Sequence, residues 1–206
     1  MKTILWIGGG VLLALLLLFV CLWIANRRKK QKGIAGERRV AKALRRFVRK
    51  HGGRVWNNAY LPLYKGACEV DHLVFCPAGI VVVETKNVGG TVSGNGKQLT
   101  HTMGNRVHSL YNPALQNQTH VDNVQHHLRK AGLDGIPVYA IVVFADPHVV
   151  LHTDAGIPLS QLPDWLARLP KRKANWQAAY DALHSIRIRS PLKKLLHDRQ
   201  AGKQKR

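Results

Sequence analysis

The chain has 206 residues, which leaves room for one domain of ordinary size and an appendage, and for no larger assembly of domains. Its 32 Lys and Arg residues against 11 Asp and Glu residues give a formal net charge of +21. Such a charge favours a polyanionic partner, nucleic acid or a membrane surface, over a basic face that only aids solubility. The three cysteines lack the spacing of a secreted disulfide framework or a zinc ribbon, so we expect them to be reduced and structural.

The first predicted element is an apolar run at residues 4–25 that contains no charge. About 20 such residues suffice to cross a bilayer. A cleaved signal peptide is the main alternative, but its apolar region is usually shorter, roughly 7–15 residues, and a small-residue cleavage site follows it. A basic segment follows this run, so we predict a transmembrane helix at 4–25 and a basic juxtamembrane linker at 26–32.

The charges around this run predict its orientation. Five cations follow it directly and one precedes it. The positive-inside rule then places the C-terminal side in the cytoplasm. We therefore predict a single-pass protein of the inner (cytoplasmic) membrane with its N-terminus outside, in which residues 27–32 can also contact anionic lipid headgroups.

Residues 33–51 have helical periodicity, with an apolar stripe that includes Val40 and Leu44 and cations on the opposite side. Glu37 falls beside the stripe near the start of this helix, where the helix dipole alone would account for an acidic residue. The cations expected to contact nucleic-acid phosphates are Arg38, Lys42, Arg45, Arg46 and Arg49.

A strand is expected at residues 54–63, followed by a hairpin of two β-rich runs, 69–75 and 80–86, around a short turn. If Phe75 pairs with Ile80, Asp71 comes opposite Glu84. Glu84 and Lys86 then project from the same face of their strand. A slip of one residue would separate the charged groups.

Two carboxylates and an ammonium at one strand end suit hydrolysis of a phosphodiester. Mg²⁺ prefers oxygen ligands, which Asp71, Glu84 and the main-chain carbonyl of Thr85 would supply. Lys86 would position the attacking water or stabilise the phosphorane as charge builds up. The alternative is a structural Lys–Glu pair at an exposed strand end, which is worth at most about 1 kcal/mol. This alternative has to be considered because many chains contain the pattern of these residues by chance.

Residues 87–105 predict further strand and loop, and Asn112 and Pro113 predict the start of a helix that runs to about Lys130 and stops at Gly132. A core face and a polar stripe are expected on this helix. The polar stripe consists of Gln116, His120, Asn123 and His127. Later elements are expected to be strands at 138–144 and 149–151 and short helices at 160–169 and 175–186. This order predicts an α/β or α+β sandwich around one sheet.

Other residues suggest weaker alternatives. His120, His126 and His127 lack acidic or cysteine partners at ligand spacing, so we expect surface histidines rather than a zinc site. The glycines of residues 89–96 lack the Gly-Lys-Ser/Thr end of a phosphate loop and predict turns. Trp165 and Trp176 are expected to be core residues.

Three stretches, GIAGERRVAKAL, EVDHLVFCPAGIVVVETKN and NPALQNQTHVDNVQHHL, resemble the NERD (nuclease-related) domain of the PD-(D/E)XK nuclease superfamily. The resemblance covers residues 33–144. It implies a restriction-endonuclease-like core, α/β in class, in which a mixed β-sheet is flanked by helices and carries the site at one edge. The roles that it implies are metal ligation by Asp71 and Glu84, catalysis by Lys86, an auxiliary carboxylate from Glu37 and a polar contribution from Gln116.

The resemblance has one departure, because Val70 stands where the superfamily nominally has a proline, at a position that varies among its members. It implies a NERD nuclease-like domain at 33–150, which leaves a C-terminal helical extension at 151–190 and a basic tail at 191–206. The expected activity is that of a membrane-anchored nuclease that uses Mg²⁺ or Mn²⁺ and cuts DNA, and a homodimer is compatible with the superfamily. The alternatives are a non-catalytic DNA-binding module and a membrane scaffold that binds anionic lipid.

Overall fold

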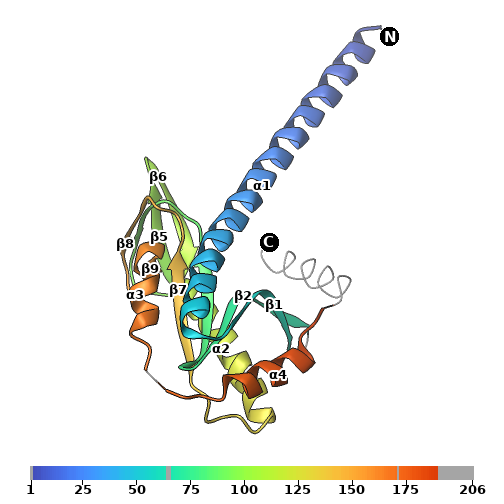
Figure 1. The fold of residues 1–206 in the computed structure, drawn as a ribbon. Helices are drawn as coiled ribbons and strands as arrows, with labels where there is room; N and C mark the ends of the chain where they lie inside the picture. Colours follow the sequence, from blue (N-terminus) through green and yellow to red (C-terminus); the bar gives the residue numbers. More distant parts are fainter. Residues whose placement is uncertain (1, 64–65, 171, 190–206) are drawn as a thin grey trace. The chain divides into compact units, whose positions relative to one another are not determined.

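The structure is a computed structural model that describes residues 2–63, 66–170 and 172–189; the side chains of residues 2–15, 25 and 29 are outside its description. The chain divides into two compact units, Met1–Ala35 and Gly36–Arg206, and each is considered by itself. Figure 1 shows the elements in chain order. They are α1 (Lys2–His51), β1 (Arg54–Pro62), β2 (Ala67–Cys76), β3 (Gly79–Lys86), β4 (Gly90–Ser93), β5 (Gln98–Met103), β6 (Arg106–Tyr111), α2 (Pro113–Lys130), β7 (Val138–Phe144), β8 (Val149–His152), β9 (Ile157–Pro158), the 3-10 turn η1 (Leu159–Gln161), α3 (Leu162–Ala167) and α4 (Trp176–Ile186).

Helix α1 ends at His51, as predicted, and runs without a break through residues 26–32, where a linker is predicted. Among the residues that the structure describes, no helix has the length and apolar character needed to cross a membrane. The predicted span at 4–25 falls largely on side chains outside the described residues, as does the predicted basic tail at 191–206.

The strands form two sheets instead of the single predicted one. The first has the order β1-β2-β3-β7-β9 and the second has the order β6-β5-β4-β8, and both mix parallel with antiparallel pairs. After β3 the chain turns at Gly90, whose φ of +81° suits glycine, and β4 pairs with β5 and β8 instead of returning to the first sheet. The prediction of one sheet was wrong because nothing local in residues 87–111 says which strands they join.

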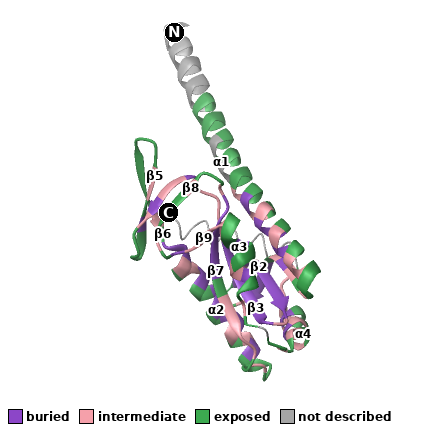
Figure 2. Ribbon diagram, turned by 60° about the vertical axis from the view of Figure 1, so that its left-hand side comes forward, coloured by how far each residue is buried: buried purple, intermediate pink, exposed green. Residues whose placement is uncertain are grey.

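The predicted hairpin is confirmed in its register. β2 and β3 are antiparallel, and Phe75 pairs with Ile80. The last main-chain pair joins His72 to Val83, so the next two opposed positions are Asp71 and Glu84. Both strands are largely buried (Figure 2), which explains their continuous runs of Val, Ile, Leu and Phe.

Helices cover both faces of the first sheet. α2 and α4 close one core with β1, β2 and β3, and Trp176 packs against it. The part of α1 within Gly36–Arg206 closes the other core together with α3 and Trp165. Val40 and Leu44 are fully buried there, as the apolar stripe predicts. The predicted C-terminal extension packs on these same cores, since β9 pairs with β7 and α4 covers β1 and β2.

Helix α2 has the predicted limits. The Asn112 side chain accepts a hydrogen bond from the Ala114 N–H at 2.9 Å and caps the helix, and Gly132 follows its end with a φ of +68°. The buried Asn117 side chain donates to the main-chain carbonyls of Val82 and Ile141, each at 3.1 Å. These bonds fix α2 against β3 and β7, and with it the side chains that α2 directs toward the end of β3.

Candidate active site

Asp71 lies where the side-chain alternation of β2 changes. Val70 and Leu73 both belong to the core under α2, which two residues of a regular strand three positions apart could not do. On β1, the opposing Asn58 has a φ of +49°, and the main-chain pairs on either side of it leave Asn58 and Asp71 unpaired. The Asp71 carboxylate accepts a hydrogen bond from the Thr85 N–H at 2.7 Å, which replaces the next rung of the ladder.

Glu84 and Lys86 project from β3 toward α2, as their i, i+2 spacing predicts. The Lys86 ammonium donates to Glu84 Oε1 at 2.6 Å and to Gln116 Oε1 at 2.9 Å. Gln116 belongs to the first turns of α2, so the helix and the strand together orient the ammonium. Only 2% of Glu84 is exposed, so its pairing with Lys86 is not a solvated surface contact.

His120 is a site residue that the sequence interpretation placed wrongly. Only 8% of it is exposed, and its Nε2 lies 3.4 Å from Glu84 Oε2, an ion-pair distance without the alignment of a hydrogen bond. Its Nδ1 lies 2.8 Å from the sulfur of Cys68, which is also buried. The available signal was its spacing of four residues from Gln116, which puts both on one face of α2. His126, by contrast, is exposed, as expected.

Glu37 contributes a third carboxylate from α1. Its Oε2 accepts a hydrogen bond from the Asn58 side chain at 3.2 Å, so it lies beside the unpaired position of β1. Its charge raises the pKa of Asp71 further, although less than burial and Glu84 do. The structure thus brings together the predicted catalytic and metal-binding residues, which come from α1, β2, β3 and α2.

The surroundings of the site change the pKa values of its charged groups in different directions. Burial, and then the charge of Glu84, raise the pKa of Asp71 to about 7. Burial opposes ionisation of Glu84 too, but its polar contacts with His120 and Lys86 outweigh burial and lower its pKa. Burial alone would lower the pKa of His120, whereas its contacts with Cys68 and Glu84 raise it to about 10. At neutral pH the site therefore holds an ionised Glu84 beside an Asp71 that is only partly ionised.

The donor set fits a hard divalent cation. Glu84 Oε2 is buried without a hydrogen-bond partner. The charges of Glu84 and Glu37 oppose ionisation of Asp71, and a bound cation would relieve this repulsion. The Thr85 carbonyl points to the same side of β3 as its N–H, toward Asp71. Among the described residues, no group of three or more His, Cys, Asp or Glu side chains is arranged to hold a metal ion by itself. Two carboxylates and a carbonyl would leave the remaining positions to water and substrate, as is usual for Mg²⁺.

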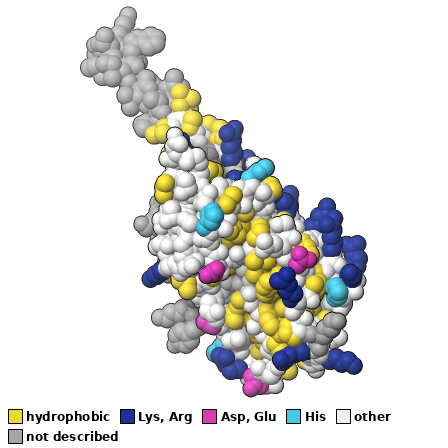
Figure 3. Space-filling view, turned by 90° about the vertical axis from the view of Figure 1, so that its left-hand side faces the viewer, with side chains coloured by type: hydrophobic (Ala, Val, Ile, Leu, Met, Phe, Trp, Pro, Cys, Tyr) yellow, Lys and Arg dark blue, Asp and Glu magenta, His cyan; other side chains and the backbone are white. Residues whose placement is uncertain are grey.

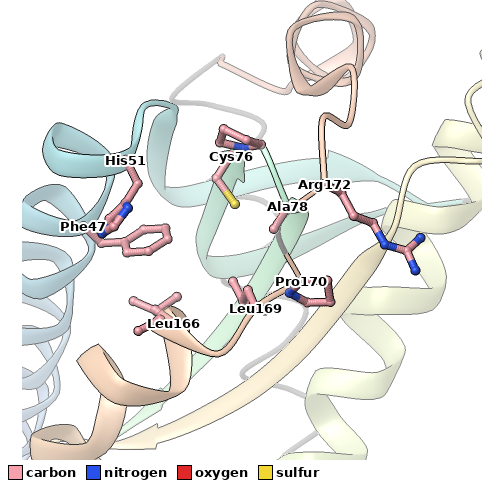
Figure 4. A pocket seen from close by; sticks show the side chains of 10 residues that line it. Phe47, His51, Cys76, Ala78, Leu166, Leu169, Pro170 and Arg172 are labelled. Atoms are coloured by element: carbon pink, nitrogen blue, oxygen red, sulfur yellow. The ribbon is translucent and has the colours of Figure 1, made fainter.

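A cavity of about 250 Å³ lies elsewhere in the Gly36–Arg206 unit and contains none of the site residues. Figure 4 shows the Cys76 sulfur and the rings and methyl groups of Phe47 and Leu166 directed into it. The candidate site is therefore an assembly of polar groups at the end of the paired β2 and β3 strands and does not belong to this apolar hollow.

The five predicted phosphate-binding cations of α1, Arg38, Lys42, Arg45, Arg46 and Arg49, are all exposed. Figure 3 shows numerous Lys and Arg side chains and few Asp and Glu on the face that it draws. Arg45 also lies close enough to the β2 residue His72 to lower its pKa, although less than burial does. Arg45 therefore lies near the strand that carries Asp71.

Part of the chain is similar to known proteins. The family described as "Nuclease-related domain" (NERD) matches residues 32–145. An uncharacterized protein of Bacillus anthracis is 33% identical over 98 residues, which are 47% of this chain and 46% of that protein. The chain thus matches about half the length of this curated relative. No solved structure matches the chain.

Proposed function

The chain belongs to the family of proteins with a nuclease-related (NERD) domain, and from that premise we propose that it is a divalent-metal-dependent nuclease that hydrolyses phosphodiester bonds of DNA. The observation that carries the proposal is the meeting of Asp71, Glu84 and Lys86 at the end of the β2–β3 hairpin. Their order and spacing resemble those of the PD-(D/E)XK superfamily, and the proposal assigns the chain to it.

Each residue of the site has a distinct part in this proposal. Asp71, Glu84 and the Thr85 carbonyl would hold Mg²⁺ or Mn²⁺. When bound, such an ion supplies polarisation of the scissile phosphate and a lowered pKa for a coordinated water. Lys86 lies against Glu84 and can donate to the phosphate oxygens as negative charge builds up on them. Gln116 holds Lys86 in place by accepting one of its hydrogen bonds.

The non-catalytic alternative explains these contacts less well. A scaffold or DNA-binding module would need the basic surface of α1 but would have no use for a buried carboxylate whose second oxygen lacks a hydrogen-bond partner. Glu84 is paired with Lys86 and His120, but removing such a buried pair from water costs free energy, and apolar side chains often stabilise such positions more. The retention of Asp71, Glu84 and Lys86 together therefore supports hydrolysis.

Plasmid cleavage tests the proposal. The full chain in detergent is incubated with supercoiled plasmid and Mg²⁺, Mn²⁺ or EDTA, beside Glu84→Gln and Lys86→Ala. Metal-dependent nicking or linearisation should fall by at least about 100-fold in both variants. Glu69→Gln, on the same strand as Asp71 but outside the site, is the matched control and should cleave as the wild type does.

Two other outcomes would contradict the proposal. Equal cleavage by the wild type and both site variants would identify a contaminating nuclease. Absence of cleavage with retained, salt-sensitive binding of DNA would favour the non-catalytic module, and binding that follows anionic vesicles instead of DNA would favour the membrane scaffold.

We also propose that residues 4–25 anchor the chain in the cytoplasmic membrane, with the Gly36–Arg206 unit in the cytoplasm. The support is the uncharged apolar run and the five cations that follow it. The full chain should remain in the membrane pellet after alkaline extraction, whereas a variant with three Lys residues placed within 4–25 should be released. Release of the wild type would contradict the anchor.

A further inference from the structure

Glu84 is held from two sides by groups of different origin. On one side Lys86, from the same strand, binds Oε1 at 2.6 Å. On the other side His120, from α2, places Nε2 3.4 Å from Oε2. A carboxylate contacted at both oxygens has little freedom to rotate about its last side-chain bond, so His120 and Lys86 together define which way it faces.

His120 is itself held in place. Its Nδ1 lies 2.8 Å from the Cys68 sulfur on β2, and the two residues are 8% and 6% exposed, respectively. On α2, His120 lies four residues after Gln116, which binds Lys86. One face of α2 therefore supplies both supports, one for the ammonium and one for the carboxylate.

We propose that His120, fixed by Cys68, is a positioning residue of the nuclease site that orients Glu84 toward Asp71. The inference rests on the proposed function, because Glu84 is taken as a ligand of the divalent ion. It goes beyond the motif, since neither Cys68 nor His120 belongs to the D…ExK pattern. Outer-sphere partners of a ligand commonly affect metal affinity or activity about 10- to 100-fold when they are removed.

An ordinary buried histidine is the competing explanation. Such a residue would satisfy its polar atoms within the core, and an apolar replacement would change stability alone. Here the chain of contacts from Cys68 through His120 ends on the one buried carboxylate of the site. A positioning role therefore requires an effect on ion binding that is separable from any effect on stability.

The test is the binding of Mn²⁺ alone to the full chain in detergent, measured by isothermal titration calorimetry without nucleic acid. His120→Ala should weaken Mn²⁺ binding about 10-fold or more. Cys68→Ser keeps a hydrogen-bond partner for Nδ1 and should bind Mn²⁺ nearly as the wild type does, whereas Cys68→Ala should be weakened severalfold. His126→Ala, on the exposed side of the same helix, is the matched control and should be unchanged.

Thermal unfolding followed by circular dichroism identifies any variant that fails to fold. If His120→Ala does not fold, the comparison of Cys68→Ser with Cys68→Ala decides, and equal Mn²⁺ affinity of these two would overturn the proposal. A folded His120→Ala chain that binds Mn²⁺ as tightly as the wild type would overturn it directly.

The experiments distinguish failure of the proposed nuclease function from failure of the positioning role of His120. A wild type that binds Mn²⁺ in a His120-dependent way but cleaves no nucleic acid would overturn the nuclease proposal alone and support the positioning role. A wild type that cleaves plasmid while His120→Ala keeps full Mn²⁺ affinity would overturn only the positioning role. A wild type without Mn²⁺ binding would overturn both.

Discussion

At the scale of single residues, Asp71 is the group whose environment most opposes its charge. Burial, and then the neighbouring Glu84 carboxylate, raise its pKa from 3.8 to about 7. The folded chain therefore binds this proton more tightly than the unfolded chain does. Without a metal ion, Asp71 should contribute to stability at low pH, and that contribution should be lost as pH rises from about 4 to about 7.

Asp71→Asn should consequently stabilise the metal-free protein above pH 7. The amide oxygen can still accept from the Thr85 N–H, and the opposed charge is gone. We expect a gain of roughly 2 kcal/mol near pH 8, because solvent at this partly exposed position reduces the full linkage value. That gain corresponds to about 4–8 °C in the midpoint of thermal unfolding. It should nearly vanish at about pH 4, where both forms are uncharged in the folded chain.

Added Mg²⁺ should reverse the order of the two proteins, since the wild type would gain stability from the ion and Asp71→Asn would gain less. Unfolding midpoints at both pH values, with and without Mg²⁺, check this prediction. Asp134→Asn, an exposed carboxylate in the turn after α2, serves as the control. Equal midpoints for wild type and Asp71→Asn in metal-free buffer near pH 8 would show that the charge of Asp71 does not destabilise the folded chain.

At the scale of elements, the approach of α1 to the loop after β3 determines where Glu37 lies. A Cβ at Gly36 would come within 2.5 Å of the Asn87 Cβ, so any larger residue must displace the helix or the loop. In the next turn of α1, Arg39 donates to Asn87 Oδ1 at 2.9 Å. A displacement of α1 here would therefore disturb the Arg39–Asn87 hydrogen bond and shift the Glu37 carboxylate.

Gly36→Ala should destabilise the Gly36–Arg206 unit by about 1–3 kcal/mol and lower cleavage, as Glu37 shifts. The matched control is Gly33→Ala, three residues earlier on the same helix, where an added Cβ meets no atom within 4 Å. Alanine favours helix there by up to about 1 kcal/mol, so this control should be neutral or stabilising. Urea unfolding followed by tryptophan fluorescence measures both. Equal stability of the two variants would mean that α1 does not approach Asn87 closely.

Asn117 performs a similar function for α2. Asn117→Ala removes two hydrogen bonds to the carbonyls of β3 and β7 at a buried position and leaves a small cavity. We expect a loss of about 2 kcal/mol in the free energy of unfolding. Gln118→Ala, at the next and exposed position, should cost less than about 0.5 kcal/mol. A loss for Asn117→Ala no larger than that of Gln118→Ala in urea unfolding would contradict its role as a fixing point of α2.

The elements that could be predicted from the sequence are those with local signals. The β2–β3 register follows from strand alternation and a short turn, and the limits of α2 follow from Asn112 and Gly132. The second sheet could not be predicted, because β4 pairs with β8, almost 60 residues later, and no local pattern names that partner. His120 was missed because helical periodicity shows which side chains share a face but not what covers that face. The end of β3 places Glu84 there.

At the scale of the whole molecule, net charge and site geometry serve different steps. The site depends on a few groups a few ångströms apart, whereas the formal charge of +21 acts over the Debye length, about 8–10 Å in ordinary buffers. Phosphate contacts by exposed cations give affinity without sequence preference. The protein should therefore bind duplexes of unrelated sequence alike and lose affinity steeply as salt is raised.

Arg38 and Lys42 are exposed cations of α1 that follow Glu37 within the Gly36–Arg206 unit. Replacing both with Gln should lower the slope of log affinity against log salt by about 2, since each phosphate contact contributes about 0.9 for duplex DNA. Cleavage under saturating DNA should change little, because neither side chain belongs to the site. Filter binding at several salt concentrations, in detergent and without metal, measures the slope.

The matched control neutralises two exposed cations at the second sheet, one in the bend before β5 and one on β6, as Lys97→Gln with Arg106→Gln, and removes the same net charge. If DNA lies along α1, only the α1 pair should lower the slope, although both pairs reduce the net charge of the protein by the same amount. An equal loss of slope in the two double variants would mean that binding follows net charge alone. The DNA would then have no fixed path past Lys86, and cleavage would depend on random encounters with the hairpin end.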